Sequence, residues 1–240
     1  MNTMLRGLAA LVIYVAPLAA IAQQQGATWD GLVEIRPKRV DTAFLQPGAD
    51  FRPYRKVIVD PVVVAFRKDW LKSVNANVPL SERVTEDDAE RMAIRTREIF
   101  ADVFADVLKR AGLELAAAPG TDVLRVRPGV IDLYIAAPEA SSGARSRTFT
   151  MEAGEATLFL EASDSTSGAL LGRVIDKRTT RNSGRLRLTN ELTNESDLRA
   201  LFRRWAETCV KGFEELRALS PLPEDLAPGW TPDLKPSASD

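Results

Sequence analysis

The chain has 240 residues, of which 27% are charged and 45% hydrophobic, and its 32 basic and 33 acidic side chains leave a net charge of −1. This size and composition suit one globular domain, and the balanced charge favours neither nucleic acid nor an anionic membrane as a partner. The sequence contains no histidine, which excludes histidine-dependent zinc sites and Ser-His-Asp triads. We therefore expect no metal, no cofactor and no catalytic residue.

Residues 1–22 have the pattern of a signal peptide. Arg6 precedes an apolar run that is shorter than the roughly 20 residues of a membrane-spanning helix. Ala20 and Ala22 occupy the −3 and −1 positions of a signal peptidase site, so we expect cleavage before Gln23. Because bacterial lipoproteins need a cysteine at that point, we expect no lipid anchor and a mature protein that is periplasmic or secreted.

Residues 23–53 are rich in Gln, Pro, Gly and isolated charges. The lack of a sustained period predicts an extended arm that lies on a domain formed by residues 54–219. A β-branched run at residues 56–66 then predicts a strand. Pro61 lies inside this run and cannot donate a hydrogen bond, so the strand should lie at a sheet edge or carry a bulge at that point.

Two segments have the periodicity of amphipathic helices. Thr85 and Asp88 resemble a capping box at the start of the first, and Gly112 should end it. Asn194 or Ser196 should cap the second. Its apolar stripe comprises Leu198, Leu201, Phe202, Trp205, Cys209, Phe213 and Leu216.

Residues 113–180 have the pattern of strands, and residues 164–168 combine Asp, Ser, Thr and Gly in a way that predicts a hairpin turn. The five prolines among residues 220–240 predict a disordered tail. The predicted fold is therefore a single α+β domain, with a mainly antiparallel sheet on which two amphipathic helices pack.

Several segments carry a family resemblance: Trp29-Asp30-Gly31-Leu32, Asp60-Pro61-Val62, Ala65-Phe66-Arg67-Lys68-Asp69-Trp70, Ala153-Gly154-Glu155-Ala156 and Leu171-Gly172-Arg173-Val174-Ile175-Asp176. On these residues the chain resembles the bacterial envelope family catalogued as domain of unknown function 3313, over roughly residues 29–213. The resemblance implies an exported α+β domain, and it supplies no reaction. Many members of that family are lipoproteins, and this sequence departs from them at Gln23.

The densest basic segment is the first candidate binding site. It comprises Arg173, Lys177, Arg178, Arg181, Arg185 and Arg187. At strand spacing Arg173 and Lys177 share a face, and the loop arginines would join them to bind phosphate or carboxylate groups of an envelope component or an acidic partner protein. The alternative is an exposed, charged strand edge that discourages aggregation.

The second candidate site is an aromatic groove formed by Trp29, Tyr54, Phe66 and Trp70. The alternative is that these side chains tie the arm to the domain. Among the acidic residues, Glu152, Glu155, Glu161 and Asp164 are candidates for a carboxylate pair that would cleave glycosides, and the alternative is solvated carboxylates at strand ends and turns. The single thiol, Cys209, should be buried and inert.

Three functions are compatible with these features. We favour a non-catalytic binding or adaptor domain of the cell envelope, whose partner is an envelope protein or an anionic envelope component. The second is a periplasmic carrier or sensor of a small or lipid-like ligand, and the third is a carboxylate-based hydrolase. A lined apolar cavity between sheet and helices would favour the second function, and carboxylates that converge in a cleft would favour the third.

Overall fold

The computed structural model describes residues 30–136, 150–179 and 191–232, with backbone only at 136, 150–154, 179 and 191–194. The predicted signal peptide, its cleavage site, Trp29 and the three arginines at 181, 185 and 187 lie outside these residues. The strands are β1 (Val33–Ile35), β2 (Thr42–Leu45), β3 (Lys56–Val59), β4 (Val63–Phe66), β5 (Glu114–Leu115), β6 (Val123–Ala136), β7 (Thr150–Asp164) and β8 (Leu170–Thr179). The helices are α1 (Trp70–Val74), the 3₁₀ helix η1 (Leu80–Glu82), α2 (Glu86–Arg110) and α3 (Glu191–Leu219).

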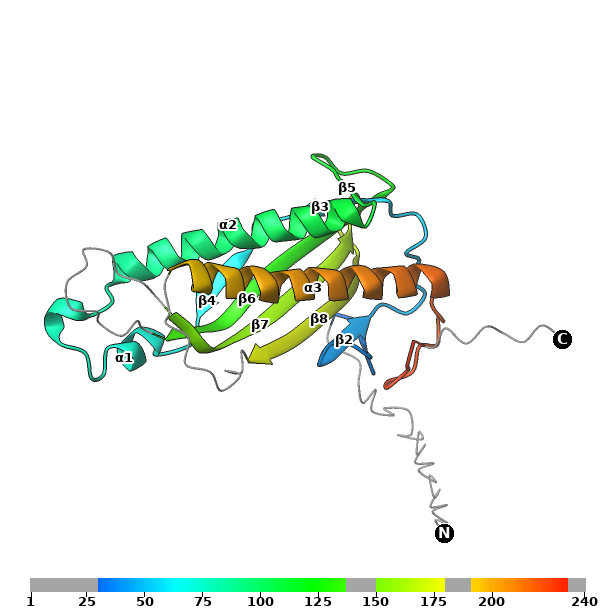
Figure 1. Ribbon diagram of the computed structural model, residues 1–240. Coiled ribbons are helices and arrows are strands. Elements are labelled where there is room, and N and C mark those ends of the chain that lie inside the picture. Colours follow the sequence, from blue (N-terminus) through cyan, green and yellow to red (C-terminus); the bar gives the residue numbers. More distant parts are fainter. Residues whose placement is uncertain (1–29, 137–149, 180–190, 233–240) are drawn as a thin grey trace, which may run out of the picture.

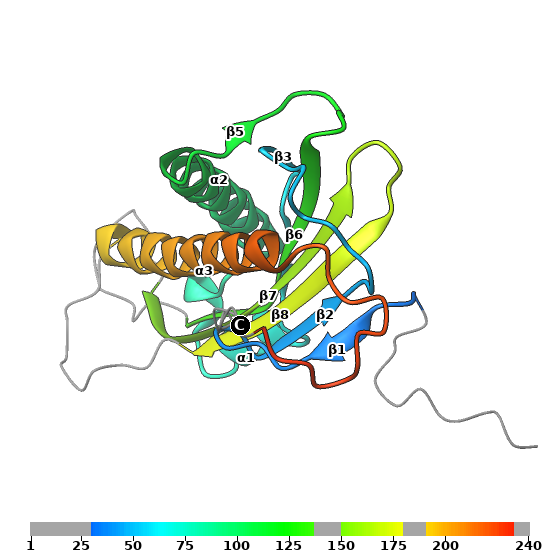
Figure 2. The same ribbon diagram turned by 90° about the vertical axis from the view of Figure 1, so that its right-hand side faces the viewer.

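These elements form one eight-stranded sheet with the two long helices, α2 and α3, on one of its faces (Figures 1 and 2). The strand order is β1-β2-β8-β7-β6-β3-β5, and β4 also pairs with β6. Strands β1, β2, β8, β7 and β6 pair antiparallel, whereas the pairs that involve β3, β4 and β5 are parallel. The predicted α+β class and mainly antiparallel sheet are confirmed.

The run at residues 56–66 forms two strands rather than one. Strands β3 and β4 follow each other along the same edge of β6, and Pro61 lies in the break between them. This break agrees with the missing N–H group of proline, which prevents a continuous ladder at that point.

Helix α2 has the predicted capping box. Thr85 Oγ1 accepts a hydrogen bond from the backbone N–H of Asp88 at 3.2 Å, and Asp88 Oδ2 accepts one from the backbone N–H of Thr85 at 2.8 Å. The hairpin turn between β7 and β8 is also confirmed. Asp164 Oδ1 accepts backbone hydrogen bonds from Thr166 and Ser167, and Gly168 has a φ of +74°.

Helix α3 begins earlier than predicted. It starts at Glu191, so Asn194 and Ser196 lie inside the helix and the predicted cap is wrong. The predicted apolar stripe is correct, because the side chains of Phe202 and Trp205 are fully buried. Phe202 meets Phe100 of α2 edge-to-face at 5.2 Å between ring centroids, which joins the two helices above the sheet.

The segment predicted as an extended arm contributes two strands to the sheet. Strand β2 pairs with β8, and β1 pairs with β2 at the end of the sheet. Leu32 and Leu45 are buried and hold this segment against the rest of the domain. Strands of three and four residues are too short to show a period in the sequence, and their pairing partners are distant along the chain.

The predicted disorder of the proline-rich tail is wrong for residues 220–232. Leu222 and Leu226 are only 2% and 5% exposed, and the backbone N–H of Leu222 donates to the carbonyl of Ala49 at 2.9 Å. Further along, the N–H of Arg36 donates to the carbonyl of Trp230 at 2.8 Å. The prolines prevent helix and strand, but they do not prevent burial of the leucines between them.

Candidate functional site

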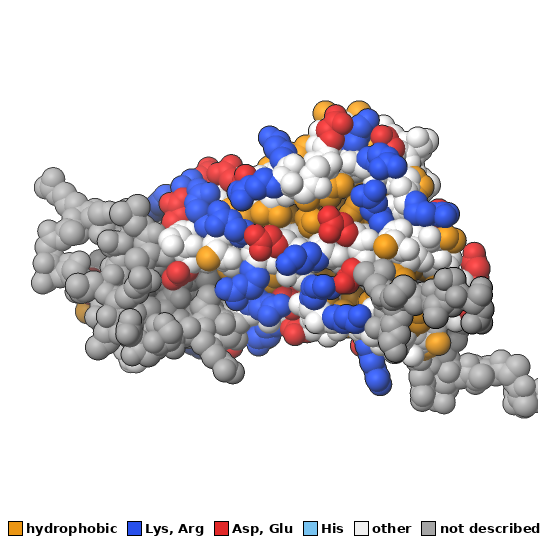
Figure 3. Space-filling view, turned by 45° about the vertical axis from the view of Figure 1, so that its right-hand side comes forward, with side chains coloured by type: hydrophobic (Ala, Val, Ile, Leu, Met, Phe, Trp, Pro, Cys, Tyr) orange, Lys and Arg blue, Asp and Glu red, His pale blue; other side chains and the backbone are white. Residues whose placement is uncertain are grey.

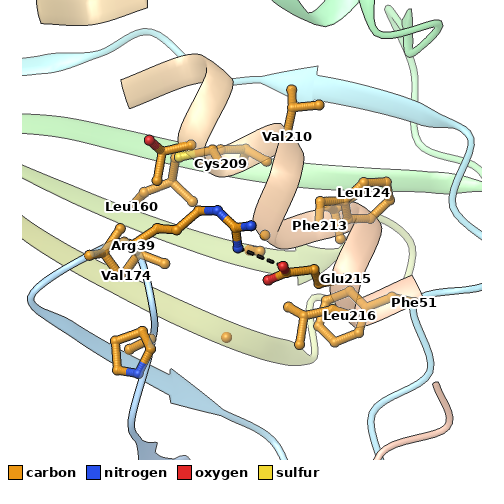
Figure 4. A pocket seen from close by; sticks show the side chains of 18 of the residues that line it. Arg39, Phe51, Leu124, Leu160, Val174, Cys209, Val210, Phe213, Glu215 and Leu216 are labelled. Carbon is orange, nitrogen blue, oxygen red and sulfur yellow. Dashed lines mark hydrogen bonds and ion pairs between the residues drawn. The ribbon is translucent and has the colours of Figure 1, made fainter. Parts of the chain in front are cut away.

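A cavity of about 170 Å³ lies between the C-terminal half of α3, the sheet and the β1–β2 loop, which we define as residues 36–41 (Figure 4). Its walls are mostly hydrophobic. The main wall residues include Leu124, Leu160 and Val174 from the sheet and Cys209, Phe213 and Leu216 from α3. A concave site lined by apolar side chains, with a few polar groups, is typical of small-molecule binding.

Small residues explain why space remains at this point. Gly212 lies three residues after Cys209 and four before Leu216, so all three share one face of α3. A Cβ atom added at Gly212 would meet nothing within 4 Å. Ala206 of α3 and Gly172 of β8 also line the cavity. The gap would therefore close if α3 carried a large side chain at position 212.

The β1–β2 loop supplies charged groups at the mouth of the cavity. Pro37, Lys38, Arg39 and Val40 all line it. Arg39 Nη1 donates to Glu215 Oε1 of α3 at 2.6 Å, and Figure 4 shows this ion pair beside the apolar walls. The ion pair connects the β1–β2 loop to α3, although the two residues lie 176 positions apart in the sequence.

A buried carboxylate holds the end of the same loop. Asp176 of β8 has no solvent exposure, and it accepts hydrogen bonds from Trp205 Nε1 at 2.8 Å and Arg178 Nε at 2.6 Å. The backbone N–H of Asp41 also donates to it, at 3.2 Å. Arg178 in turn donates to the carbonyl of Arg39 at 3.1 Å. This network fixes the loop to both β8 and α3.

The thiol of Cys209 behaves as part of the apolar wall. Burial, with a smaller contribution from Asp176, raises the pKa of Cys209 to about 12. The thiol is therefore protonated at neutral pH, and a protonated thiol is neither a good nucleophile nor a good metal ligand.

The described members of the basic segment are each paired with a carboxylate. Arg173 Nη2 contacts Asp30 at 2.5 Å and Glu161 at 2.7 Å, and Lys177 Nζ contacts Glu155 at 3.3 Å. Arg173 and Lys177 do share a face of β8. Their neighbour Arg178 instead points to the opposite face, where it binds the buried carboxylate under α3. The three side chains therefore form no single cationic patch. On the face shown in Figure 3, basic and acidic side chains are likewise interspersed, with hydrophobic side chains between them.

The described aromatic candidates lie in two separate places. Tyr54 belongs to the smaller hydrophobic cluster, around β1 and β2, and its hydroxyl donates to Asp164 Oδ2 at 3.0 Å. Phe66 and Trp70 stack on each other at 4.2 Å between ring centroids, and Trp70 Nε1 donates to the carbonyl of Ile135 at 2.8 Å. Tyr54 and Trp70 are buried, so they anchor their segments, and the three described aromatics do not line one groove.

The acidic candidates do not converge either. Glu155 forms an ion pair with Lys177, and Glu161 forms one with Arg173. Asp164 accepts hydrogen bonds from the backbone of the β7–β8 turn. The side chain of Glu152 lies outside the described residues. Among the residues described, no group of three or more Asp, Glu and Cys side chains could hold a metal ion. Of the helices in the same residues, none has the length and hydrophobicity that a membrane span requires.

Sequence reasoning missed two features of the cavity. One is Gly212, which interrupts the apolar stripe of α3 and lines the cavity, with no atom within 4 Å of the position that a Cβ would occupy. The other is the run Arg36-Pro37-Lys38-Arg39, which is basic but lies in the segment predicted as an arm. The glycine within a helical stripe was a visible signal, since glycine is unfavourable in a helix interior without a packing reason.

The fold and the cavity define an α+β domain that encloses a small apolar site under a long helix. The chain belongs to the family described as "Protein of unknown function (DUF3313)", whose model matches residues 27–209. Comparison with curated proteins finds no match.

Some solved structures resemble the chain at a low level. A PelC dodecamer from Paraburkholderia phytofirmans has 13% sequence identity and a TM-score of 0.34, with 75% of this chain and 96% of that chain covered. A minor lipoprotein from Acinetobacter baumannii has 11% identity and a TM-score of 0.33, with 68% and 95% covered. A putative neuraminyllactose-binding hemagglutinin homolog from Helicobacter pylori has 12% identity and a TM-score of 0.34, with 72% and 92% covered. We transfer no function at these values.

Proposed function

We propose that the protein is a non-catalytic binding protein of the cell envelope that holds a small apolar ligand in the cavity under α3. The observation that carries this proposal is the apolar cavity itself, since a carrier or sensor of a small ligand needs such a cavity between sheet and helices. Its volume of about 170 Å³ is close to that of an engineered protein cavity of about 150 Å³ that binds benzene.

The hypothesis of a macromolecular partner bound through the basic segment receives less support. Arg173, Lys177 and Arg178 are each engaged by carboxylates of the protein itself. A ligand that used them would have to break these ion pairs, and Arg178 would leave the buried Asp176 without its strongest partner. We therefore place the ligand in the cavity rather than on this segment.

A binding role without chemical turnover is supported by the groups that line the cavity. Glu215 is bound by Arg39, and the raised pKa of Cys209 keeps the thiol protonated. Neither group is prepared to act as a base or a nucleophile at neutral pH.

Export to the envelope is supported by the signal-peptide pattern of residues 1–22. N-terminal sequencing of the protein from the periplasm or the medium should begin at Gln23. Recovery of the mature protein with Met1 still attached would contradict export with cleavage.

The ligand proposal is tested with benzene and hexan-1-ol as neutral probes, followed by NMR of the methyl groups of Leu124, Leu160 and Val174. We expect both probes to shift these signals. In a Gly212→Leu variant the new side chain should fill the cavity and abolish the shifts, because Gly212 faces open space. An Ala218→Leu variant adds leucine at an exposed position of the same helix and should leave binding unchanged. Failure of both probes to shift these methyl signals in the wild-type protein would contradict the proposal.

A further inference from the structure

We infer that the ligand is an aliphatic alcohol, whose alkyl chain fills the cavity and whose uncharged hydroxyl group is held at the mouth between Glu215 and Arg39. This inference rests on the proposed function and specifies the chemical class of the ligand. It is carried by the combination of apolar walls with a mouth whose charges are paired with each other.

The charged side chains around the cavity already have partners within the protein. Among the described residues that line the cavity they are Lys38, Arg39, Arg173 and Glu215. Arg39 and Glu215 bind each other, Arg173 is bound by two carboxylates, and Lys38 also has a partner. An ionised head group would lose hydration at this mouth without gaining an unpaired opposite charge. A neutral head group avoids that cost.

The ion pair at the mouth keeps hydrogen-bonding capacity on both sides. Arg39 Nη1 donates to Glu215 Oε1 at 2.6 Å, and within the described parts of the chain Glu215 Oε2 accepts no hydrogen bond. The guanidinium of Arg39 has further donor hydrogens beyond the one that it uses here. A hydroxyl group can donate one hydrogen bond and accept another. It can therefore donate to Glu215 Oε2 and accept from Arg39 without breaking the ion pair.

The ion pair lies where the end of an alkyl chain in the cavity can reach it. Glu215 follows Gly212 by three residues, so both lie on one flank of α3, and both line the cavity. Figure 4 shows the Arg39–Glu215 pair beside the apolar side chains of Val174 and Leu216. The side chain of Glu215 is only 18% exposed, so a hydroxyl group bound to it is partly shielded from water, which strengthens the hydrogen bond.

The volume of the cavity limits the length of the alkyl chain. Because a cavity of about 150 Å³ accepts benzene, a cavity of about 170 Å³ should accept a segment of about six carbon atoms. Burial of each methylene group should tighten binding about fourfold. In a series from butan-1-ol to decan-1-ol, the affinity should therefore rise with chain length and level off after the cavity is filled.

The experiment compares hexan-1-ol with 1-methoxypentane, hexanoate and hexylammonium by NMR titration of the full mature chain. The ether is an isomer of hexan-1-ol that accepts hydrogen bonds but donates none, so it should bind about fivefold more weakly. Each ion should bind about tenfold more weakly than the alcohol, because neither finds an unpaired charge at the mouth.

Two variants should change the selectivity in opposite directions. Glu215→Gln leaves Arg39 without its carboxylate and should tighten hexanoate binding about tenfold. Arg39→Gln leaves Glu215 without its cation and should tighten hexylammonium binding by a similar factor. Glu214→Gln and Arg36→Gln are the matched controls, because each removes an exposed charge from the same helix or loop outside the cavity lining. The controls should leave all four affinities unchanged, and urea denaturation verifies that each variant is folded.

The results separate the two proposals. If hexan-1-ol binds in the cavity but the ether or either ion binds equally well, the alcohol inference is overturned while the apolar site stands. The same holds if the two variants of the ion pair leave the selectivity unchanged. If neither hexan-1-ol nor benzene shifts the methyl signals of the cavity, the proposed function fails as well.

Discussion

The indole N–H of Trp205 in α3 donates a 2.8 Å hydrogen bond to the carboxylate of Asp176, which lies in β8 with no solvent exposure. A buried charge is tolerated only when it is fully hydrogen-bonded, and here Arg178 Nε and the N–H of Asp41 complete its partners. This interaction joins the helix that roofs the cavity to the sheet that forms its floor.

Replacement of Asp176 should therefore be strongly destabilising. In Asp176→Ala, the Arg178 charge and the indole N–H lose their partner, and the free energy of unfolding should fall by about 3–5 kcal/mol. Trp205→Phe removes one hydrogen bond to the charged group, keeps most of the ring packing and should cost about 1.5–3 kcal/mol. Urea denaturation measures both, and a loss below about 1 kcal/mol in Asp176→Ala would show that the network does not hold the helix.

Phe104 tests the interface of α2 with the rest of the core. Its ring is 3% exposed and stacks on Phe100 at 3.9 Å between centroids. Phe104→Ala should lower the free energy of unfolding by about 3–5 kcal/mol. Ile94 lies on the same helix but is 45% exposed, so Ile94→Ala should change it by only about 0.5 kcal/mol. Equal effects of the two changes would contradict the assignment of the buried face.

Leu222 tests the ordered part of the tail. Leu222→Ala should cost about 2–5 kcal/mol, because the side chain is buried against the β1–β2 region. Leu80→Ala is the matched control, since Leu80 is 81% exposed and should be nearly neutral. Chemical denaturation again gives the difference. If Leu222→Ala left the free energy of unfolding unchanged, the result would contradict the packing of residues 220–232 and favour the disorder that their prolines predicted.

The phenol of Tyr54 should make stability depend on alkaline pH. Burial and the hydrogen bond to Asp164 raise its pKa from 10.0 to about 12 in the folded protein. The neutral phenol is thus favoured by folding, so its contribution is fully present below pH 10 and is lost as the pH rises towards about 12. Tyr54→Phe cannot ionise, so the stability difference between wild type and variant should change only in this window. Denaturation at a series of pH values would disprove this if the difference stayed constant.

Alkylation measures the state of Cys209. Its pKa of about 12, against an ordinary value of 9.0, lowers the thiolate fraction at pH 8 by about a thousandfold. Iodoacetamide should therefore modify the native protein much more slowly than the protein unfolded in urea. Hexan-1-ol should slow the native reaction further, because the thiol lines the cavity. Mass spectrometry follows the modification, and native and unfolded rates of the same order would contradict the raised pKa of this partly buried thiol.

The features that the sequence determined depend on residues close together in the chain. The capping box joins Thr85 to Asp88, and the β7–β8 turn joins Asp164 to Ser167 and Gly168. Helix periodicity identified the buried stripe of α3 in the same way, since it reflects one element alone. The predicted start of α3 was wrong because Asn and Ser, which are suitable cap residues, can also lie inside a helix, so their presence alone does not locate its first turn.

Tertiary structure alone decided the features that depend on distant residues. Strand β2 becomes part of the sheet because it pairs with β8. The first part of the tail is ordered because Leu222 packs into the hydrophobic cluster that contains Ala49 and donates a backbone hydrogen bond to it. The cavity lies where α3 and the sheet leave space between them, lined by Ala206 and Gly212 of α3 and by Gly172 of β8, and the ion pair at its mouth joins Arg39 to Glu215 across 176 positions. Composition fixes which side chains are available, but the free energy of burying or pairing them depends on neighbours that only the folded chain supplies.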